Sequence, residues 1–141
     1  MFLKSPFENV DLPWEPRLSY ILAGLEIYDR EEAIGEALRK YNPNLSRERY
    51  EIIKEFVLRD LEYLSYRHRL ALFEILEKAL ADSDFDFSTQ FESDYDECIT
   101  IAWDETEIDD PRGFFEDIYR LASEEWKDDL QKASLEDRTA W

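Results

Sequence analysis

The sequence contains very little cysteine, histidine and glycine. Its 141 residues include one Cys, one His and three Gly. A single cysteine, Cys98, cannot form an internal disulfide, which fits a reducing compartment. No apolar stretch approaches the roughly 18 uncharged residues of a membrane span, and the N-terminus lacks the apolar run of a signal peptide. We therefore expect a cytoplasmic protein with no membrane segment.

The common catalytic and metal-binding motifs are also absent from the sequence. It has no Gly-rich phosphate loop, no Gly-x-Ser-x-Gly and no Cys or His spacing typical of zinc sites. His68 lies in a basic cluster on an expected helix, and nothing local pairs it with Cys98. We interpret His68 as a surface histidine and Cys98 as a buried strand cysteine. We expect no enzyme activity, no cofactor and no metal.

One short stretch is similar to a calcium-binding loop. Asp82-Ser83-Asp84-Phe85-Asp86 places carboxylates at positions 1, 3 and 5, as an EF-hand does. Position 6 of that loop requires glycine and position 12 requires glutamate, but Phe87 and Ser93 stand there. We therefore expect no selective calcium site.

The apolar content is high enough for a folded domain. Apolar residues make up 44% of the chain and aromatic residues 15%, which a disordered acidic chain would lack. Apolar residues recur at steps of three and four, which predicts helices. We expect a mainly α fold, a single-domain bundle of about five helices over 1–141. The expected starts are Pro16, a capping box at Asp29–Glu32, Ser46, Tyr66 and Asp110-Pro111.

Other segments depart from this helical pattern. Residues 1–16 are predicted to form an irregular N-terminal arm, and 130–141 a frayed tail. The stripe over 46–81 fits one helix or two meeting near Ser65-Tyr66, and its length favours two. Alternating apolar residues predict a small β-hairpin over about 84–103, with strands at 84–92 and 97–103. A buried helical turn remains an alternative for this segment.

The strongest signal in the sequence is its negative charge. The chain has 35 acidic residues against 17 Lys and Arg, a net charge of −18. Such a field repels nucleic acid and anionic membranes and attracts cationic surfaces. Twelve of the acids lie between Ala79 and Pro111, where there is no Lys, Arg or His. This acidity either serves binding or only keeps the protein soluble.

We call residues 82–110 the acidic-aromatic segment. Concentrated like charge repels itself, and a cationic partner would offset that cost. Phe85, Phe87, Ile99 and Ile101 are expected to pack inward while the acids face solvent. Tyr95 and Trp103 are the aromatic anchors that binding hot spots favour. The predicted partner-binding residues are Asp82, Asp84, Asp86, Glu92, Asp94, Tyr95, Asp96, Trp103, Asp104, Glu105 and Glu107.

A stretch near the C-terminus resembles a known family. Asp109-Asp110-Pro111-Arg112-Gly113-Phe114-Phe115-Glu116-Asp117-Ile118, followed by Glu125-Trp126, is similar to the Asp-x-Pro-x-Gly opening of the last helix in colicin DNase immunity proteins. The binding segment Asp-x-Ile-Tyr-Tyr-Pro of that family is absent, and Asp94-Tyr95 precedes the last helix in a comparable way. At the level of class, the chain resembles bacterial toxin-immunity proteins, including those of contact-dependent growth inhibition systems. The resemblance implies an acidic face that covers a basic nuclease.

The sequence thus favours an acidic binding protein over an enzyme. The first expectation is an immunity protein whose partner is the nuclease domain of a toxin, with no direct nucleic acid binding. An alternative is a nucleic-acid mimic that inhibits a DNA-binding or defence protein. A calcium-binding or structural adaptor protein is a third reading.

Overall fold

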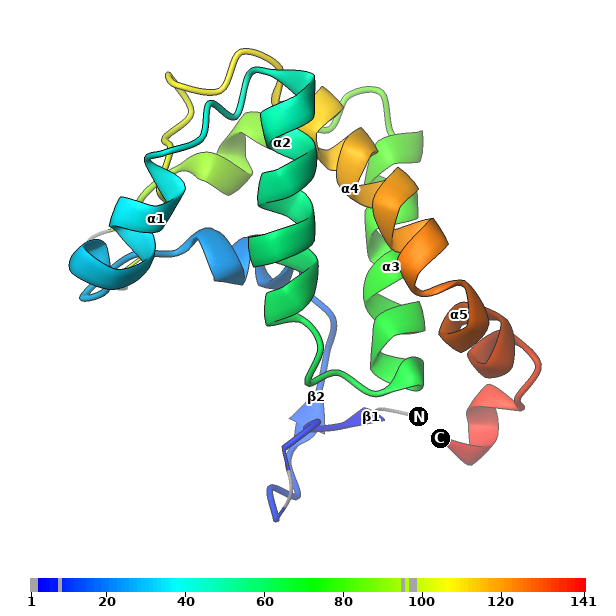
Figure 1. Ribbon diagram of the computed structural model, residues 1–141. Helices are drawn as coiled ribbons and strands as arrows, with labels where there is room; N and C mark the ends of the chain where they lie inside the picture. The colour runs from blue at the N-terminus through cyan, green and yellow to red at the C-terminus, as the bar shows by residue number, and fades with distance from the viewer. Residues whose placement is uncertain (1–2, 8, 95, 97–98) are drawn as a thin grey trace.

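The computed structural model describes residues 3–7, 9–94, 96 and 99–141. It is mainly helical with one small two-stranded antiparallel sheet, which confirms the predicted fold class (Figure 1). The elements in chain order are β1 (Leu3–Lys4), β2 (Pro13–Trp14), the 3-10 helix η1 (Leu18–Leu25), the π-helical turn η2 (Glu31–Gly35), α1 (Glu36–Leu38), α2 (Ser46–Ile52), the π-helical turn η3 (Ile53–Leu58), α3 (Tyr66–Ala81), the 3-10 helix η4 (Phe87–Phe91), α4 (Pro111–Glu125), α5 (Lys127–Ser134) and the 3-10 helix η5 (Arg138–Ala140).

Helix α4 lies at the centre of the core. It contacts α3, η3, η4 and α5, and it buries five apolar side chains, Phe114, Phe115, Ile118, Leu121 and Ala122. Its N-terminus forms as the sequence predicts, because the Asp110 side chain accepts a hydrogen bond from the Gly113 N–H and Pro111 is at the first helical position. Helix α4 therefore connects the core to the acidic-aromatic segment that precedes it.

The stripe over 46–81 forms two helical stretches, as its length indicated. The first runs through α2 and η3, the chain then turns, and α3 begins after Ser65. The Ser65 side chain caps α3 by accepting a hydrogen bond from the His68 N–H. Two other predicted caps are wrong. The residue at the N-cap of α2 is Leu45 rather than Ser46, and the residue at the N-cap of η2 is Arg30 rather than Asp29. Neither of these two residues caps its helix with a side-chain hydrogen bond.

The N-terminal arm is partly regular and is attached to α3 by a buried histidine. Strands β1 and β2 pair antiparallel within it. The ring of His68 is 8% exposed, with Nε2 2.6 Å from the carbonyl oxygen of Lys4 and Nδ1 2.5 Å from Oγ of Ser65. The Trp14 ring packs edge-on against the same imidazole. The interpretation of His68 as a surface residue is therefore wrong. Cys98 lies outside the described residues.

The predicted frayed tail is also wrong. Helix α5 extends to Ser134 and packs against α3, with Ala133 fully buried. Ion pairs join the two helices and the residues beyond, with Arg69 2.6 Å from Asp129 and Arg67 2.8 Å from Glu136. Fraying was predicted because the tail is polar. Two of its acidic side chains, however, form ion pairs with arginines in the first turn of α3.

In the described part of residues 84–103, the predicted hairpin does not form as two strands. Residues 87–91 form the 3-10 helix η4, which the Asp86 side chain caps by accepting a hydrogen bond from the Ser88 N–H. Beyond it the chain reverses at one antiparallel bridge, where Asp94 and Ile99 exchange two backbone hydrogen bonds of 2.8 Å. Within the described part of residues 84–103, this bridge is what the structure retains of the predicted hairpin. No helix within the described ranges is long and apolar enough to span a bilayer.

Candidate binding surface

The predicted contact acids lie at the surface. Ten residues of the predicted set are described, and Tyr95 lies outside the described residues. Most of the acids are exposed, and Asp104 is half-buried. The exposed members are Asp82, Asp84, Asp86, Glu92, Asp94, Asp96, Glu105 and Glu107. The expectation that the charges of this segment face solvent is confirmed for these residues.

The aromatic part of the prediction requires a correction. Trp103 is only 7% exposed and belongs to the hydrophobic core, so its ring is not available as a surface anchor. Phe87 and Ile101 are buried as expected, and Phe85 packs partly buried against the core. Ile99 was expected to point inward but is 38% exposed. The exposed surface of this segment therefore carries carboxylates but not the ring of Trp103.

Most of the described acids of this segment take part in no ion pair. Leaving Asp94 aside, no carboxylate of the segment that the structure describes takes part in an ion pair. The paired carboxylates are elsewhere, at Asp11, Glu26, Glu55, Glu74, Asp117, Asp129 and Glu136. Leaving Asp94 aside, the negative charge of these carboxylates is thus not balanced by a basic partner in the part of the chain that the structure describes.

Several of these carboxylates are held in place by local hydrogen bonds. The Asp86 carboxylate accepts from the hydroxyl and the backbone N–H of Ser88, and these bonds lower its pKa. The Asp104 carboxylate accepts from the hydroxyl and the N–H of Thr106, with the same effect on its pKa. Both carboxylates therefore stay ionised at lower pH than an ordinary aspartate.

A basic residue from α4 fixes the first part of the segment. The guanidinium of Arg112 donates to the carbonyl oxygens of Leu80, Asp82 and Phe85 at 2.8–3.1 Å. It also lies 4.8 Å from the centre of the Phe87 ring. Because its donors are directed to backbone oxygens, Arg112 orders this loop without pairing with its carboxylates.

The later part of the segment pairs with the loop after η1. The Ile27 N–H donates to the Thr100 carbonyl at 2.7 Å, and the Ala102 N–H donates to the Leu25 carbonyl at 2.8 Å. This antiparallel bridge is centred on Glu26 and Ile101. Residues about 75 positions apart in sequence are thereby held together.

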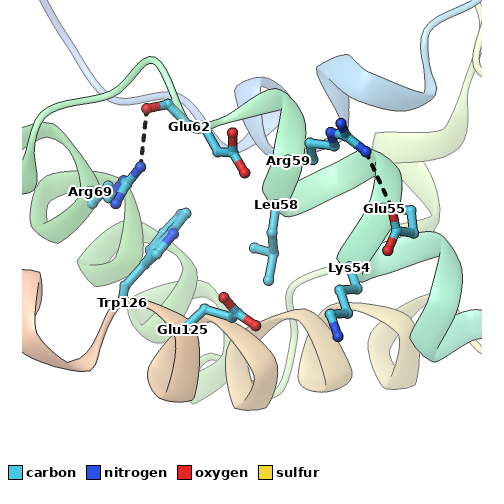
Figure 2. A pocket seen from close by; sticks show the side chains of 8 residues that line it. All are labelled: Lys54, Glu55, Leu58, Arg59, Glu62, Arg69, Glu125 and Trp126. Carbon is cyan, nitrogen blue, oxygen red and sulfur yellow. Dashed lines mark hydrogen bonds and ion pairs between the residues drawn. The ribbon is translucent and has the colours of Figure 1, made fainter.

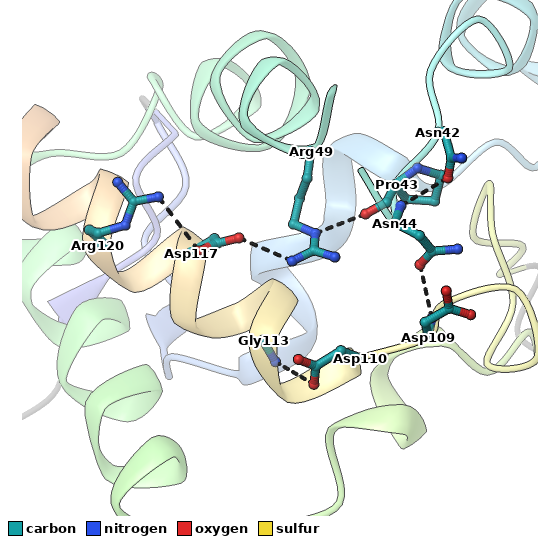
Figure 3. A network of polar contacts seen from close by, with 9 residues as sticks. All are labelled: Asn42, Pro43, Asn44, Arg49, Asp109, Asp110, Gly113, Asp117 and Arg120. Atoms are coloured by element: carbon teal, nitrogen blue, oxygen red, sulfur yellow. Dashed lines mark hydrogen bonds and ion pairs between the residues drawn. The ribbon is translucent and has the colours of Figure 1, made fainter. Parts of the chain in front are cut away.

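An asparagine before α2 fixes the end of the segment (Figure 3). The amide of Asn44 donates to the Glu107 carbonyl and accepts from the Asp109 N–H, each at 2.9 Å. In the same region, Arg49 of α2 lies 3.2 Å from Asp117 of α4. The segment is therefore attached to the body of the molecule at its start, middle and end.

Acids from two parts of the segment meet at one hollow. A shallow depression of ≈ 370 Å³ is lined by Glu92, Ser93, Asp104 and Glu105. The antiparallel bridge between Asp94 and Ile99 brings the two parts of the segment together. The depression presents carboxylates to solvent, which suits a cationic side chain.

Sequence reasoning identified the acids but missed the residues that position them. Arg112 was treated only as part of a helix start, and Asn44 was not singled out. The one available signal was the place of Arg112, the first basic residue after the acidic run. Neither residue gives a local pattern that indicates its distant carbonyl partners.

We expect Arg112→Met to lower the free energy of unfolding by about 2 kcal/mol, because three carbonyl oxygens lose a charged donor. The methionine keeps an unbranched stem over Phe87. Urea denaturation measures the difference. Arg120→Met, on the same helix, removes one exposed ion pair and should change stability by less than about 0.5 kcal/mol. Equal losses in the two variants would contradict a clamping role for Arg112.

No protein-family model matches the chain, and the searches of curated proteins and of solved structures also found no match. Within the described ranges, no group of three His, Cys, Asp or Glu is arranged to hold a metal ion.

Proposed function

We propose that this chain is an acidic inhibitor that binds a basic protein through its acidic-aromatic segment. In this proposal it is an immunity protein that neutralises a nuclease-type bacterial toxin by covering the nucleic-acid-binding or active face. The observation that carries the proposal is a surface of exposed carboxylates, among which Asp82, Asp84, Asp86, Glu92, Asp96, Glu105 and Glu107 form no ion pair with a described residue, attached firmly to the core. A surface that serves solubility alone does not need such fixed geometry.

The attachments of the segment support binding rather than charge alone. Arg112, Asn44 and the bridge at Ile101 hold the backbone from three sides. A loop that is already ordered loses less conformational entropy when a partner binds. Carboxylates in fixed positions also match the spacing of cations on one partner better than on another, which gives specificity.

The charge distribution supports fast encounter with a basic partner. Twelve of the eighteen surplus negative charges belong to residues of this one segment. A concentrated field steers an oppositely charged protein toward that side of the molecule and raises the association rate. A nuclease presents cations where it binds phosphates, so the same face that binds nucleic acid is the face attracted here.

The test of the proposal starts from the reading frame next to this one. A basic nuclease domain encoded there is purified, and its activity on DNA or RNA is measured with and without this chain. We expect loss of nuclease activity at equimolar chain and a stable complex by gel filtration. Full nuclease activity in the presence of excess chain, or a neighbouring frame without a toxin domain, contradicts the proposal.

The acidic hollow offers a matched test of the site. We expect Glu92→Gln with Glu105→Gln to slow association with that nuclease roughly threefold at low salt, because electrostatic steering weakens. Stopped-flow fluorescence at two ionic strengths measures the rate. The control is Glu15→Gln with Glu124→Gln, exposed acids that lie elsewhere, on the arm and in the last turn of α4. If the control slows association as much, only net charge matters and the site is misplaced.

A further inference from the structure

A cleft of ≈ 620 Å³ lies apart from the acidic-aromatic segment. It is bounded by η3 and the turn after it, by the first half of α3, and by the junction of α4 and α5 (Figure 2). Its floor is apolar, since it includes Leu58 and Trp126, each 6% exposed. Its walls carry charged side chains of both signs, so the ligand class depends on which charges remain unpaired.

The arginines of the cleft are already neutralised. Arg59 lies 3.4 Å from Glu55, one turn away on the same helix. Arg69 lies 2.6 Å from Asp129 and also donates to the Glu62 carbonyl at 3.1 Å. Its guanidinium stands over the Trp126 ring, 5.6 Å from a ring centre. Arg69 is therefore part of the wall rather than a free anion receptor.

Two carboxylates of the cleft remain unpaired. Glu62 and Glu125 are exposed, and within the described part of the chain neither carboxylate takes part in an ion pair or a hydrogen bond. Figure 2 shows their side chains on opposite sides of Leu58, with the Trp126 ring beside them. Against these two, Lys54 is the single lining cation outside an ion pair, and its ammonium lies 6.0 Å from the centre of the Tyr50 ring.

This arrangement selects for a cation that carries an alkyl chain. An anion would meet two free carboxylates in a protein of net charge −18, which disfavours it. A small inorganic cation would not use the apolar floor. An arginine side chain provides a methylene stem that can lie over Leu58 and Trp126, and a planar fork of donors for carboxylates.

We propose that this cleft is a second binding site, which accepts an arginine side chain of a basic peptide segment between Glu62 and Glu125. The site lies at the opposite end of α4 from the acidic-aromatic segment. The 15 residues of α4 correspond to about 22 Å. The inference uses other residues than the proposed function and is tested without any toxin.

The test uses a blocked peptide, acetyl-Gly-Gly-Arg-Gly-Gly-amide, titrated into isotopically labelled protein. The readout is the indole N–H resonance of Trp126 in two-dimensional NMR spectra. We expect a saturable shift with the arginine peptide and at least about tenfold weaker binding of the peptide with citrulline, which has the same shape without charge. The double variant Glu62→Gln with Glu125→Gln should bind the arginine peptide more weakly by a similar factor.

The matched control is Glu92→Gln with Glu105→Gln, which removes the same charge at the acidic hollow. The Trp126 shift should persist unchanged in that variant. Equal weakening in both double variants would mean general charge attraction and would overturn the site. A citrulline peptide that binds as well as the arginine peptide, or a Trp126 resonance that does not move, would also overturn it. None of these outcomes depends on whether the chain inhibits a nuclease.

Discussion

Replacing Trp103 with alanine is expected to lower the free energy of unfolding by about 4 kcal/mol, the cost typical of deleting a large buried aromatic side chain. Trp103 is 7% exposed and lies in the core together with Ile101, Ile108 and the phenylalanines of α4. Alanine leaves a cavity that these neighbours fill only in part. Urea denaturation followed by circular dichroism measures the change.

The control for this prediction is Leu135→Ala, because Leu135 is 80% exposed. The free energy of unfolding of this variant should differ from that of the unchanged protein by less than about 0.5 kcal/mol, as for most surface substitutions. A Trp103→Ala variant of unchanged stability that dissociates faster from a partner would contradict the core assignment. It would return Trp103 to the role of a contact residue that its sequence context indicated.

A single added methyl group at Gly24 is expected to cost about 3 kcal/mol of stability. Gly24 is buried where η1 crosses η3. A Cβ atom there would overlap the carbonyl oxygen of Phe56 and lie 2.9 Å from Cβ of Asp60. Backbone atoms cannot rotate away, so the two helical elements would have to separate. Thermal and urea unfolding of Gly24→Ala measure the loss.

Gly35 provides the opposite case within the same chain. A Cβ there meets its nearest neighbour, Cδ1 of Ile27, at an ordinary 3.7 Å, and Gly35 lies inside a helical stretch. Gly35→Ala should therefore raise stability by roughly 0.5–1 kcal/mol, since alanine favours helix. If Gly24→Ala and Gly35→Ala lower stability equally, the close packing of η1 on η3 does not explain why position 24 requires glycine.

The sequence predicted helices well where an apolar stripe continues over several turns. The stripe over 46–81 and the Asp110-Pro111 start gave the correct elements because periodicity and capping are local properties. The segment 84–92 failed for a physical reason. Phe87 and Phe91 occupy alternate positions as in a strand, but residues 87–91 form a 3-10 helix in which both rings are buried. Both rings pack against the phenylalanines of α4, Phe114 and Phe115, and this packing favours the helical turn over the strand.

The burial of His68 and the order of the tail depend on residues far along the chain. His68 is buried because the arm places the Lys4 carbonyl and the Trp14 ring against it. Arg69 of α3 pairs with Asp129 of α5, and Arg67 of α3 pairs with Glu136 in the residues after α5, which holds this part of the tail in place. A charged residue in a polar stretch gives no local sign of such a partner, so composition alone predicted exposure and fraying.

The exposed carboxylates of the candidate surface could be predicted from the sequence, but the residues that attach the segment to the core could not. A run of acids without Lys or Arg has few internal partners within reach, so the exposure of its carboxylates follows from composition. The attachments are different, since Asn44 and Glu107 are 63 positions apart and Arg112 and Leu80 are 32 apart. Trp103 was misassigned because an aromatic residue among acids fits a surface anchor and a core residue equally well.

The three attachments of the acidic-aromatic segment link ligand recognition to the stability of the whole chain. Because Asn44, Ile27 and Arg112 belong to separate parts of the fold, the carboxylates reach their relative positions only in the native state. A ligand that recognises this arrangement binds the native chain and not the unfolded one. At a free concentration one hundred times its dissociation constant, it adds about 2.7 kcal/mol to the free energy of unfolding. A rise in melting temperature therefore reports a ligand of the native chain, even before its identity is known.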